Sequence, residues 1–252
     1  MKYRVIAFDY DGTLVDTFRF HVNTIGRIVR ECGACASKEE IARLVGIPLD
    51  AIFEQTLPKG KNEEALLKLK KLYKNILPSD WQNMKLIEYV KETLDELKMQ
   101  GVRIALITNS HRDLISASLA YFQLDSYFDW VLAAGDVMLS KEERLGRIQQ
   151  EAKVEKQEVL YVGDTAGDII AAHHVGIDGA LIINDYSWFF RQKEEMSIPN
   201  TEYVLKNISE ILNIEDSLDI NEEDLNLKNT YKECNKNDLD IDSIKENQKI
   251  KN

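Results

Sequence analysis

Carboxylate side chains follow two of the short apolar runs in this sequence. Asp9 and Asp11 come directly after the run at residues 3–8, and Asp164 comes directly after the run at residues 159–163. Runs of this length, rich in β-branched and aromatic residues, are typical of buried β-strands. The carboxyl ends of parallel strands meet at one edge of a sheet, where ligands bind in such folds. We therefore expect these three carboxylates to surround one small volume.

Asp168 is expected to join this group. It lies four residues after Asp164, so the two share a face if a helix starts there. Clustered carboxylates repel one another and are costly to bury unless a cation neutralises them. Mg²⁺ suits this role because it is a hard ion that takes oxygen ligands and is often shared with a phosphate. The set Asp9, Asp11, Asp164 and Asp168 therefore predicts a magnesium site.

Such a cluster can transfer a phosphoryl group from a small phosphorylated metabolite. Asp9 would attack phosphorus and form an aspartyl-phosphate, a covalent route open to carboxylates. Asp11, two residues on, would point elsewhere in an extended turn, protonate the leaving oxygen and later deprotonate the attacking water. Magnesium would hold Asp9 and the phosphoryl oxygens together and offset their repulsion.

Three further residues are expected to bind the phosphoryl group. Thr108 and Asn109 follow another apolar run and can donate from a hydroxyl and an amide. Lys141, at the start of a predicted helix, is placed to balance the phosphoryl charge. Glu142 and Glu143 follow it at once, so a surface lysine on a charged helix is the alternative interpretation.

Alternating strands and helices must position these residues. We predict strands at 3–8, 102–108, 130–134, 159–163 and 180–183, the last of them ending the series. Helices are predicted at 86–99, from the end of the strand at 102–108 up to residue 122, at 141–153 and at 165–175. This alternation implies parallel βαβ units with right-handed crossovers, and hence an α/β fold with a Rossmann-like parallel sheet.

A helical block interrupts this series after the first strand. Apolar residues recur at helical spacing through residues 17–77, and the stretch from Ser37 to Glu40 is typical of a capping box at a helix start. We predict a core of residues 1–16 and 82–213 and a helical cap of residues 17–81. Residues 214–252 are rich in acids, lysine and asparagine, which predicts a disordered tail.

Three motifs in this order resemble those of the haloacid dehalogenase superfamily. DYDGTL at residues 9–14 is similar to its first motif, ITN at 107–109 to its second, and GDTAGD at 163–168 to its fourth. The third-motif lysine of close relatives is often followed by proline, whereas Glu142 follows Lys141 here. The helical block resembles the cap of phosphoglycolate-phosphatase-like members.

The resemblance implies specific roles. Asp9 would be the nucleophile and Asp11 the acid/base. The metal ligands would be the side chains of Asp9 and Asp164 and the backbone carbonyl of Asp11, with Asp168 binding directly or through a water. The cap would face the catalytic pocket, which makes Arg43 and the loop beginning at Gly46 candidates for substrate contact. Apart from the resemblance, His21 in the first cap helix is expected to be exposed at the surface, with an approach to the cleft as the alternative.

Composition narrows the remaining possibilities. The 252 residues carry a formal net charge of −11, with 44% hydrophobic and 30% charged residues. This suits a globular protein with a sizeable core and argues against a nucleic-acid partner, which needs a basic patch. No apolar run approaches the roughly 20 residues that span a bilayer. No signal-peptide pattern opens the sequence, so we expect a cytoplasmic protein. Oligomeric state is left open.

Alternatives remain at this stage. A phosphomutase or an inorganic pyrophosphatase would use the same acids, with the cap deciding between them. A signalling receiver also pairs acids, magnesium, a threonine and a lysine around a phospho-accepting aspartate, but it needs neither Asp11 nor a cap. A scaffold protein acting through its acidic tail is a further possibility, against which the intact set of acids argues.

Overall fold

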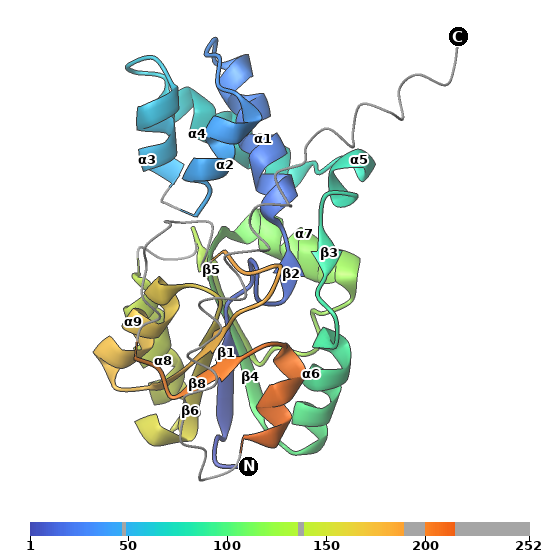
Figure 1. Cartoon of the computed structure of the whole chain (residues 1–252), viewed down its shortest axis with the longest axis vertical. Coiled ribbons are helices and arrows are strands. Elements are labelled where there is room, and N and C mark those ends of the chain that lie inside the picture. The colour runs from blue at the N-terminus through green and yellow to red at the C-terminus, as the bar shows by residue number, and fades with distance from the viewer. Residues whose placement is uncertain (47–48, 136–138, 189–199, 215–252) are drawn as a thin grey trace. The chain divides into compact units, whose positions relative to one another are not determined.

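A computed structural model describes residues 1–46, 49–135, 139–188 and 200–214. Six parallel strands form one sheet in the order β5-β4-β1-β6-β7-β8 (Figure 1). Their bounds are β1 Val5–Phe8, β4 Arg103–His111, β5 Trp130–Ala134, β6 Val159–Gly163, β7 Asp178–Ile182 and β8 Tyr203–Leu205. The predicted α/β fold with a Rossmann-like parallel sheet is therefore confirmed. All but the first residue of the predicted tail lies outside the described residues.

Both faces of the sheet are buried. Alternate residues of β1 enter different clusters, with Ile6 and Phe8 in one and Val5 and Ala7 in the other. Such strands are apolar along their whole length because helices cover both faces. In Figure 1, α8 and α9 lie on one side of the sheet and α6 on the other. The covering helices are α6 Val90–Met99, α7 Arg112–Phe122, α8 Lys141–Ala152 and α9 Ala166–Val175, with the short 3₁₀ helices η1 Lys156–Glu158 and η2 Ile208–Asn213.

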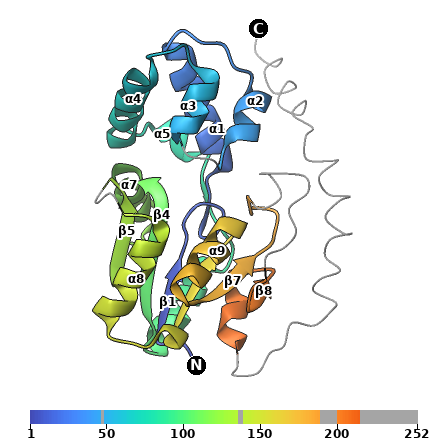
Figure 2. The same cartoon turned by 90° about the vertical axis from the view of Figure 1, so that its left-hand side faces the viewer.

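Helices also fill the block after the first strand. Figure 2 shows α1 to α4 gathered together, and these are α1 Phe18–Glu31, α2 Lys38–Leu44, α3 Leu49–Thr56 and α4 Asn62–Lys74. The predicted capping box is present at the start of α2. The Ser37 hydroxyl accepts from the backbone of Glu40 at 3.1 Å, and the Glu40 carboxylate accepts from the backbone of Ser37 at 2.7 Å. The short helix α5, Pro78–Trp81, follows.

Two short strands join these helices to the sheet. β2, Val15–Asp16, pairs antiparallel with β3, Lys85–Leu86, so the segments that leave and re-enter the sheet region run side by side. The predicted helix over 86–99 was therefore wrong at its start, because Leu86 pairs with Val15 and α6 begins only at Val90.

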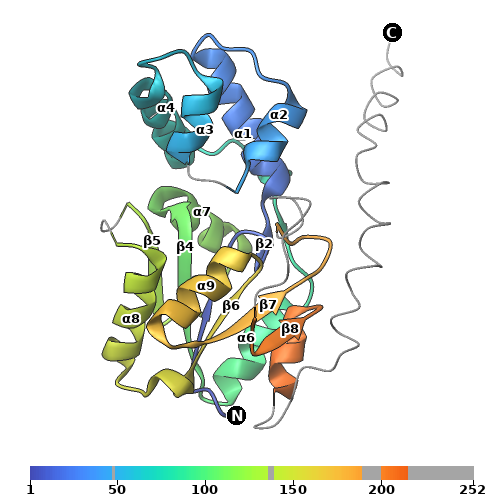
Figure 3. The ribbon, with the colours of Figure 1, turned by 60° about the vertical axis from the view of Figure 1, so that its left-hand side comes forward.

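Two strand predictions were also wrong, one in where a strand ends and one in which strand is the last. The strand predicted to end at Thr108 continues to His111, with an irregular register against β5 after Ile107. The strand predicted as the last is followed by β8, which pairs with β7 at the edge of the sheet (Figure 3). Three residues are too few to show a strand pattern in the sequence, so β8 is recognisable only through its pairing with β7.

Candidate active site

Asp9 lies immediately after β1 and is almost completely buried. The residue is 7% exposed, and its backbone N–H donates to the carbonyl of Val162 on the neighbouring strand at 2.8 Å. This bond continues the ladder between β1 and β6 and fixes the main chain where the strand ends. The Nζ of Lys141, the first residue of α8, donates to Asp9 Oδ1 at 3.2 Å.

Three predicted metal ligands converge at this point. Carboxylate oxygens of Asp9, Asp164 and Asp168 lie within 4.8 Å of one another, and all three residues are buried. Asp164 directly follows β6, and Asp168 lies in the first turn of α9, so one strand-to-helix turn supplies two of the three. Lys141 Nζ also donates to Asp168 Oδ1, at 2.5 Å. The Lys141 ammonium thus contacts two of the three clustered carboxylates.

The raised pKa values of Asp9 and Asp164 show that the positive charge of Lys141 does not neutralise all three carboxylates. Burial raises the pKa of Asp9 to about 7, against the opposing charge of Lys141 and with the help of the charges of Asp168 and Asp11. Burial also raises the pKa of Asp164 well above its usual range, and the negative charges of Asp168 and Asp9 add to this. The site therefore binds protons in place of the positive charge that it lacks.

Asp168 behaves differently from its two neighbours. Burial raises the pKa of its carboxyl, but the charge of Lys141 and hydrogen bonds from Lys141 and Thr165 together outweigh burial. The net pKa is below the usual range. Thr165 donates from its hydroxyl at 2.6 Å and from its backbone at 3.0 Å. The hydroxyl of Tyr161 donates to Asp168 Oδ1 at 3.1 Å. Asp168 is thus held ionised between fixed donors.

The side chain of Asp11 lies in a second set of contacts. Its carboxylate accepts from the hydroxyl of Thr17 at 2.6 Å, from the hydroxyl of Ser110 at 2.6 Å and from the hydroxyl of Thr108 at 3.5 Å. His21 Nε2 lies 3.0 Å from its Oδ1. Within the described part of the chain, the cluster of possible metal ligands is Asp9, Asp164 and Asp168, without the side chain of Asp11. The expected metal contact through the backbone carbonyl of Asp11 stays a prediction.

These donors set the charge of Asp11. Burial raises the pKa of its carboxyl, but the hydrogen bond and charge of His21, with the hydroxyls of Ser110 and Thr17, lower it below its usual range. The expectation that His21 is exposed was wrong, because the residue is 8% exposed and reaches Asp11 from α1. Thr17 and His21 lie four residues apart at the start of a helix, and this spacing places both on one face.

The two predicted phosphate-binding residues of β4 have different surroundings. Thr108 is completely buried, and its hydroxyl accepts from the backbone N–H of Ser110 at 3.0 Å. Asn109 is exposed, and its Oδ1 accepts from the guanidinium of Arg144 at 2.7 Å. Sequence reasoning missed both Ser110 and Arg144. Ser110 directly follows Asn109 on β4, in the part of the strand beyond its predicted end, whereas only the fold brings Arg144 of α8 against the end of β4.

The two predicted substrate-contacting residues lie near the end of α2. Arg43 is exposed, and no hydrogen bond or ion pair within the described ranges joins it to Asp9 or Asp11. Gly46 is exposed and has a φ of 110°. The next two residues of the loop, 47 and 48, are outside the described residues. Substrate contact by Arg43 and Gly46 therefore remains a prediction.

The turn that carries Asp11 needs a glycine. Gly12 has a φ of 76°, and a Cβ atom built there would lie 2.2 Å from Asp164 Oδ2 and 3.0 Å from the ring of Trp188. The backbone N–H of Trp188 donates to the same Asp164 oxygen at 2.6 Å. The missing side chain thus lets the first-motif loop approach Asp164 closely.

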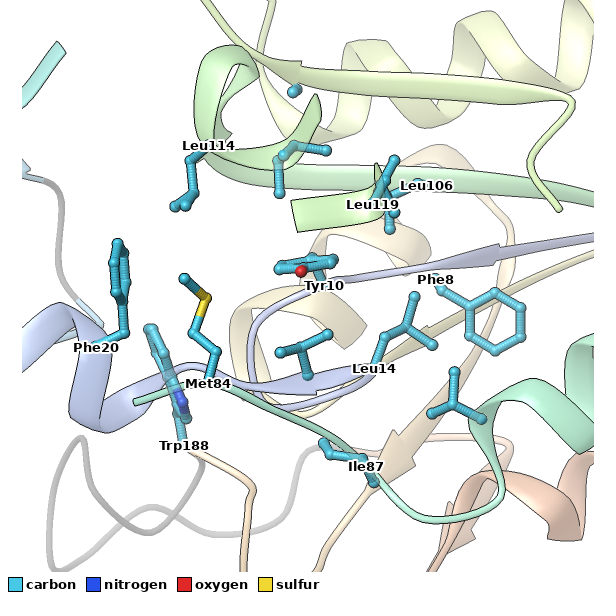
Figure 4. Close-up of a cluster of buried hydrophobic side chains, with 14 of the residues drawn as sticks. Phe8, Tyr10, Leu14, Phe20, Met84, Ile87, Leu106, Leu114, Leu119 and Trp188 are labelled. Atoms are coloured by element: carbon cyan, nitrogen blue, oxygen red, sulfur yellow. The ribbon is translucent and has the colours of Figure 1, made fainter. Parts of the chain in front are cut away.

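An apolar wall lies beside this loop. In Figure 4, Tyr10 and Leu14 belong to a buried cluster that also includes Phe20 from α1 and Trp188. The ring of Trp188 packs edge-on against His21, with ring centres 5.5 Å apart. His21, which contacts Asp11, and Trp188, whose backbone contacts Asp164, therefore support each other by packing between α1 and the segment after β7.

The donor set fits a hard divalent cation. Its members are carboxylate oxygens, which Mg²⁺ prefers over nitrogen or sulfur. Two of the three have pKa values raised by burial and by one another, so a cation would relieve a repulsion that Lys141 leaves in place.

Elsewhere in the fold, no helix within the described ranges is long and apolar enough to cross a membrane.

Comparisons with known proteins agree with this geometry. The family model described as haloacid dehalogenase-like hydrolase matches residues 6–182. A phosphoglycolate phosphatase of Vibrio parahaemolyticus is 29% identical, over 84% of this chain and 95% of its own length. The pyrophosphatase PpaX of Bacillus cereus is 26% identical, over 85% and 97%.

A solved structure shows the same fold. A haloacid dehalogenase-like family protein of Streptococcus pneumoniae superposes with a TM-score of 0.71 at 21% identity, covering 84% of this chain and 98% of that one.

Proposed function

The chain belongs to the haloacid dehalogenase-like hydrolase family, and we propose that it releases phosphate from a small phosphorylated metabolite through a phosphorylated Asp9. The observation that carries this proposal is the buried convergence of Asp9, Asp164 and Asp168, two of which, Asp9 and Asp168, accept from the ammonium of Lys141. A nucleophilic carboxylate, a cation site and a fixed positive charge are the parts that phosphoryl transfer requires.

In the first step, an oxygen of Asp9 attacks phosphorus, and the bond from phosphorus to the leaving oxygen breaks. The Asp11 carboxylate takes up a proton from solvent before this step and then transfers it to that oxygen, so the product leaves as an alcohol. Lys141 is 3.2 Å from Asp9 and offsets the charge that gathers around the phosphoryl group. Thr108 and Asn109 add donors for the phosphoryl oxygens.

In the second step, water attacks the phosphorus of the aspartyl-phosphate. Asp11 takes a proton from this water, and the bond between phosphorus and the Asp9 oxygen breaks to restore the carboxylate. The pKa of Asp11 is below its usual range, after burial is outweighed by His21 and its neighbours, and the side chain is therefore ionised. This is the form that accepts a proton from water.

Magnesium is the proposed cofactor. Asp9, Asp164 and Asp168 would hold it with their side chains, and Asp11 with its backbone carbonyl. When bound, it neutralises negative charge and polarises the phosphoryl group. The residues themselves align the phosphoryl group and move the protons.

The helical segment is proposed to act as a cap that selects the substrate. We place the cap at residues 17–81 and the core at 1–16 and 82–213. The contact between His21 and Asp11 supports this, because a residue of α1 reaches the proposed acid/base. A closed cap would exclude water during the transfer. Arg43 and Gly46, near the end of α2, are the proposed substrate contacts.

A substrate screen tests this function. Purified protein with Mg²⁺ should release phosphate from phosphoglycolate or another small phosphate monoester. Inorganic pyrophosphate belongs in the same screen, because the relative from Bacillus cereus is a pyrophosphatase. Release of phosphate from no monoester, and none from pyrophosphate or a generic aryl phosphate, would refute the proposed function.

A further inference from the structure

Arg144 connects two segments around the proposed phosphoryl site. It lies on α8, three residues after Lys141, and is only 5% exposed. Its guanidinium donates to the main-chain oxygen of Thr108 and, at 2.7 Å, to Oδ1 of Asn109. Its Nε donates to the main-chain oxygen of Ser140, the N-cap of α8, at 3.2 Å. One side chain thus links the end of β4 to the start of the helix that carries Lys141.

The chemistry of these groups fixes which way the Asn109 amide points. A guanidinium has five N–H donors and no acceptor, so it can face only the oxygen of the amide. The Nδ2 group, with two donors, must then point away from Arg144. No hydrogen bond within the described part of the chain uses Asn109 Nδ2. Asn109, an exposed residue next to the buried Thr108, therefore has two amide donors that no described residue uses.

Lysine could not hold this arrangement. Arg144 reaches Thr108, Asn109 and Ser140 at once because its donors form a planar fork. An ammonium is a point charge that cannot span these acceptors in the same geometry. Shape therefore matters here as well as charge.

We propose that Arg144 is a positioning residue that orients the Asn109 amide to donate from Nδ2 to the oxygens of a bound phosphoryl group. This rests on the proposed function for the location of the phosphoryl group. In this proposal Arg144 acts through its contact with Asn109.

A double-mutant cycle on inorganic phosphate binding tests this coupling. Affinity for phosphate in the presence of Mg²⁺ is measured by calorimetry for the wild type, Arg144→Met, Asn109→Ala and the double variant. Each single variant should bind phosphate roughly 10-fold more weakly, the loss expected for a hydrogen bond to a charged group. The double variant should bind no more weakly than Asn109→Ala. Affinity losses that multiply would show that Arg144 does not act through Asn109.

Turnover provides a second, separate measurement. For an aryl phosphate, Arg144→Met should lower kcat about 10- to 100-fold, because a misdirected donor no longer meets the transition state. Arg144→Lys should lose nearly as much, although it keeps the charge. Wild-type kcat and phosphate affinity in both variants would overturn the proposal.

Controls separate positioning from folding. Arg147→Met removes a positive charge from the same helix, where Arg147 pairs with Glu151 at 2.6 Å and its side chain is 48% exposed. This variant should keep wild-type kcat and affinity. Thermal unfolding identifies variants that fail to fold, and if Arg144→Met does so, Arg144→Lys takes its place in the cycle. A wild type that binds phosphate but releases none from any substrate would refute the proposed function, while the binding cycle would still decide the role of Arg144.

Discussion

At the scale of single residues, Asp9 and Asp11 are two positions apart but lie in opposite electrostatic surroundings. Burial and neighbouring carboxylates raise the pKa of Asp9 to about 7. Burial also raises the pKa of Asp11, but His21, Ser110 and Thr17 lower it below the usual range. Their roles should differ for this reason, since Asp9 needs a cation to be fully ionised and Asp11 does not.

Loss of His21 should impair the proposed acid/base. We expect His21→Ala to lower kcat roughly 10-fold, a part of what general acid–base catalysis contributes, because Asp11 keeps Thr17 and Ser110 but loses one fixed partner. Steady-state kinetics with an aryl phosphate would measure this. His174→Ala is the matched control, since that side chain is 67% exposed on α9 and should have no effect. Equal kcat in both variants would argue against a role for His21.

At the scale of elements, turns at the ends of β1 and β6 bring the acids together. Both turns contain a glycine whose place a side chain could not take without a clash. At Gly163, as at Gly12, a Cβ atom would lie too close to a carboxylate, here 2.4 Å from the Cγ of Asp168. The spacing of the acids therefore depends on glycine at these two positions.

Gly12→Ala should damage the site by more than backbone strain. A positive φ costs an alanine about 1–2 kcal/mol, and the new Cβ would also displace Asp164. Gly101→Ala is a close control, because Gly101 has a φ of 75° and a Cβ atom added there would meet no other atom within 4 Å. We expect both variants to unfold at lower temperature, but only Gly12→Ala to lose the stabilisation that Mg²⁺ confers. Equal stabilisation by Mg²⁺ in both variants would contradict the proposed crowding of Asp164.

Sequence patterns identified the elements with the strongest periodicity. The strands at 130–134 and 159–163 have the predicted bounds, and the residues of the three motifs could be named without a structure. The two-residue strands β2 and β3 could not be predicted, because they exist only through their pairing. The contacts of Ser110 with Asp11 and of Arg144 with Asn109 depend on packing between elements distant in sequence, and the contact of His21 with Asp11 depends on the course of the chain between β1 and α1. No local pattern reports such contacts.

At the scale of the whole molecule, the acid cluster links metal binding to stability. The pKa of Asp9 is about 7 in the fold, where burial raises it, and about 4 in an unfolded chain. The folded protein then holds a proton that the unfolded chain lacks, so without metal this carboxyl lowers stability as pH rises between these values. Asp164, with a pKa raised by burial, acts in the same direction.

Stabilisation by Mg²⁺ should therefore increase with pH. At pH 5.5 protons compete with the cation for Asp9 and Asp164, whereas at pH 8 Asp9 is mostly ionised. We expect the Mg²⁺-induced rise in Tm to be larger at pH 8 than at pH 5.5, and to be largely lost in Asp164→Asn. Differential scanning fluorimetry at a fixed excess of Mg²⁺ measures this. A rise that is independent of pH would place the cation away from these carboxylates.

The nucleophilic role of Asp9 is the central claim, and one comparison tests it most directly. Release of phosphate from an aryl phosphate with Mg²⁺ is measured for the wild type and for Asp9→Asn, with circular dichroism to confirm that both are folded. An amide is a poor nucleophile, so we expect turnover to fall by roughly 10³-fold or more. Wild-type turnover by a folded Asp9→Asn variant would contradict the mechanism.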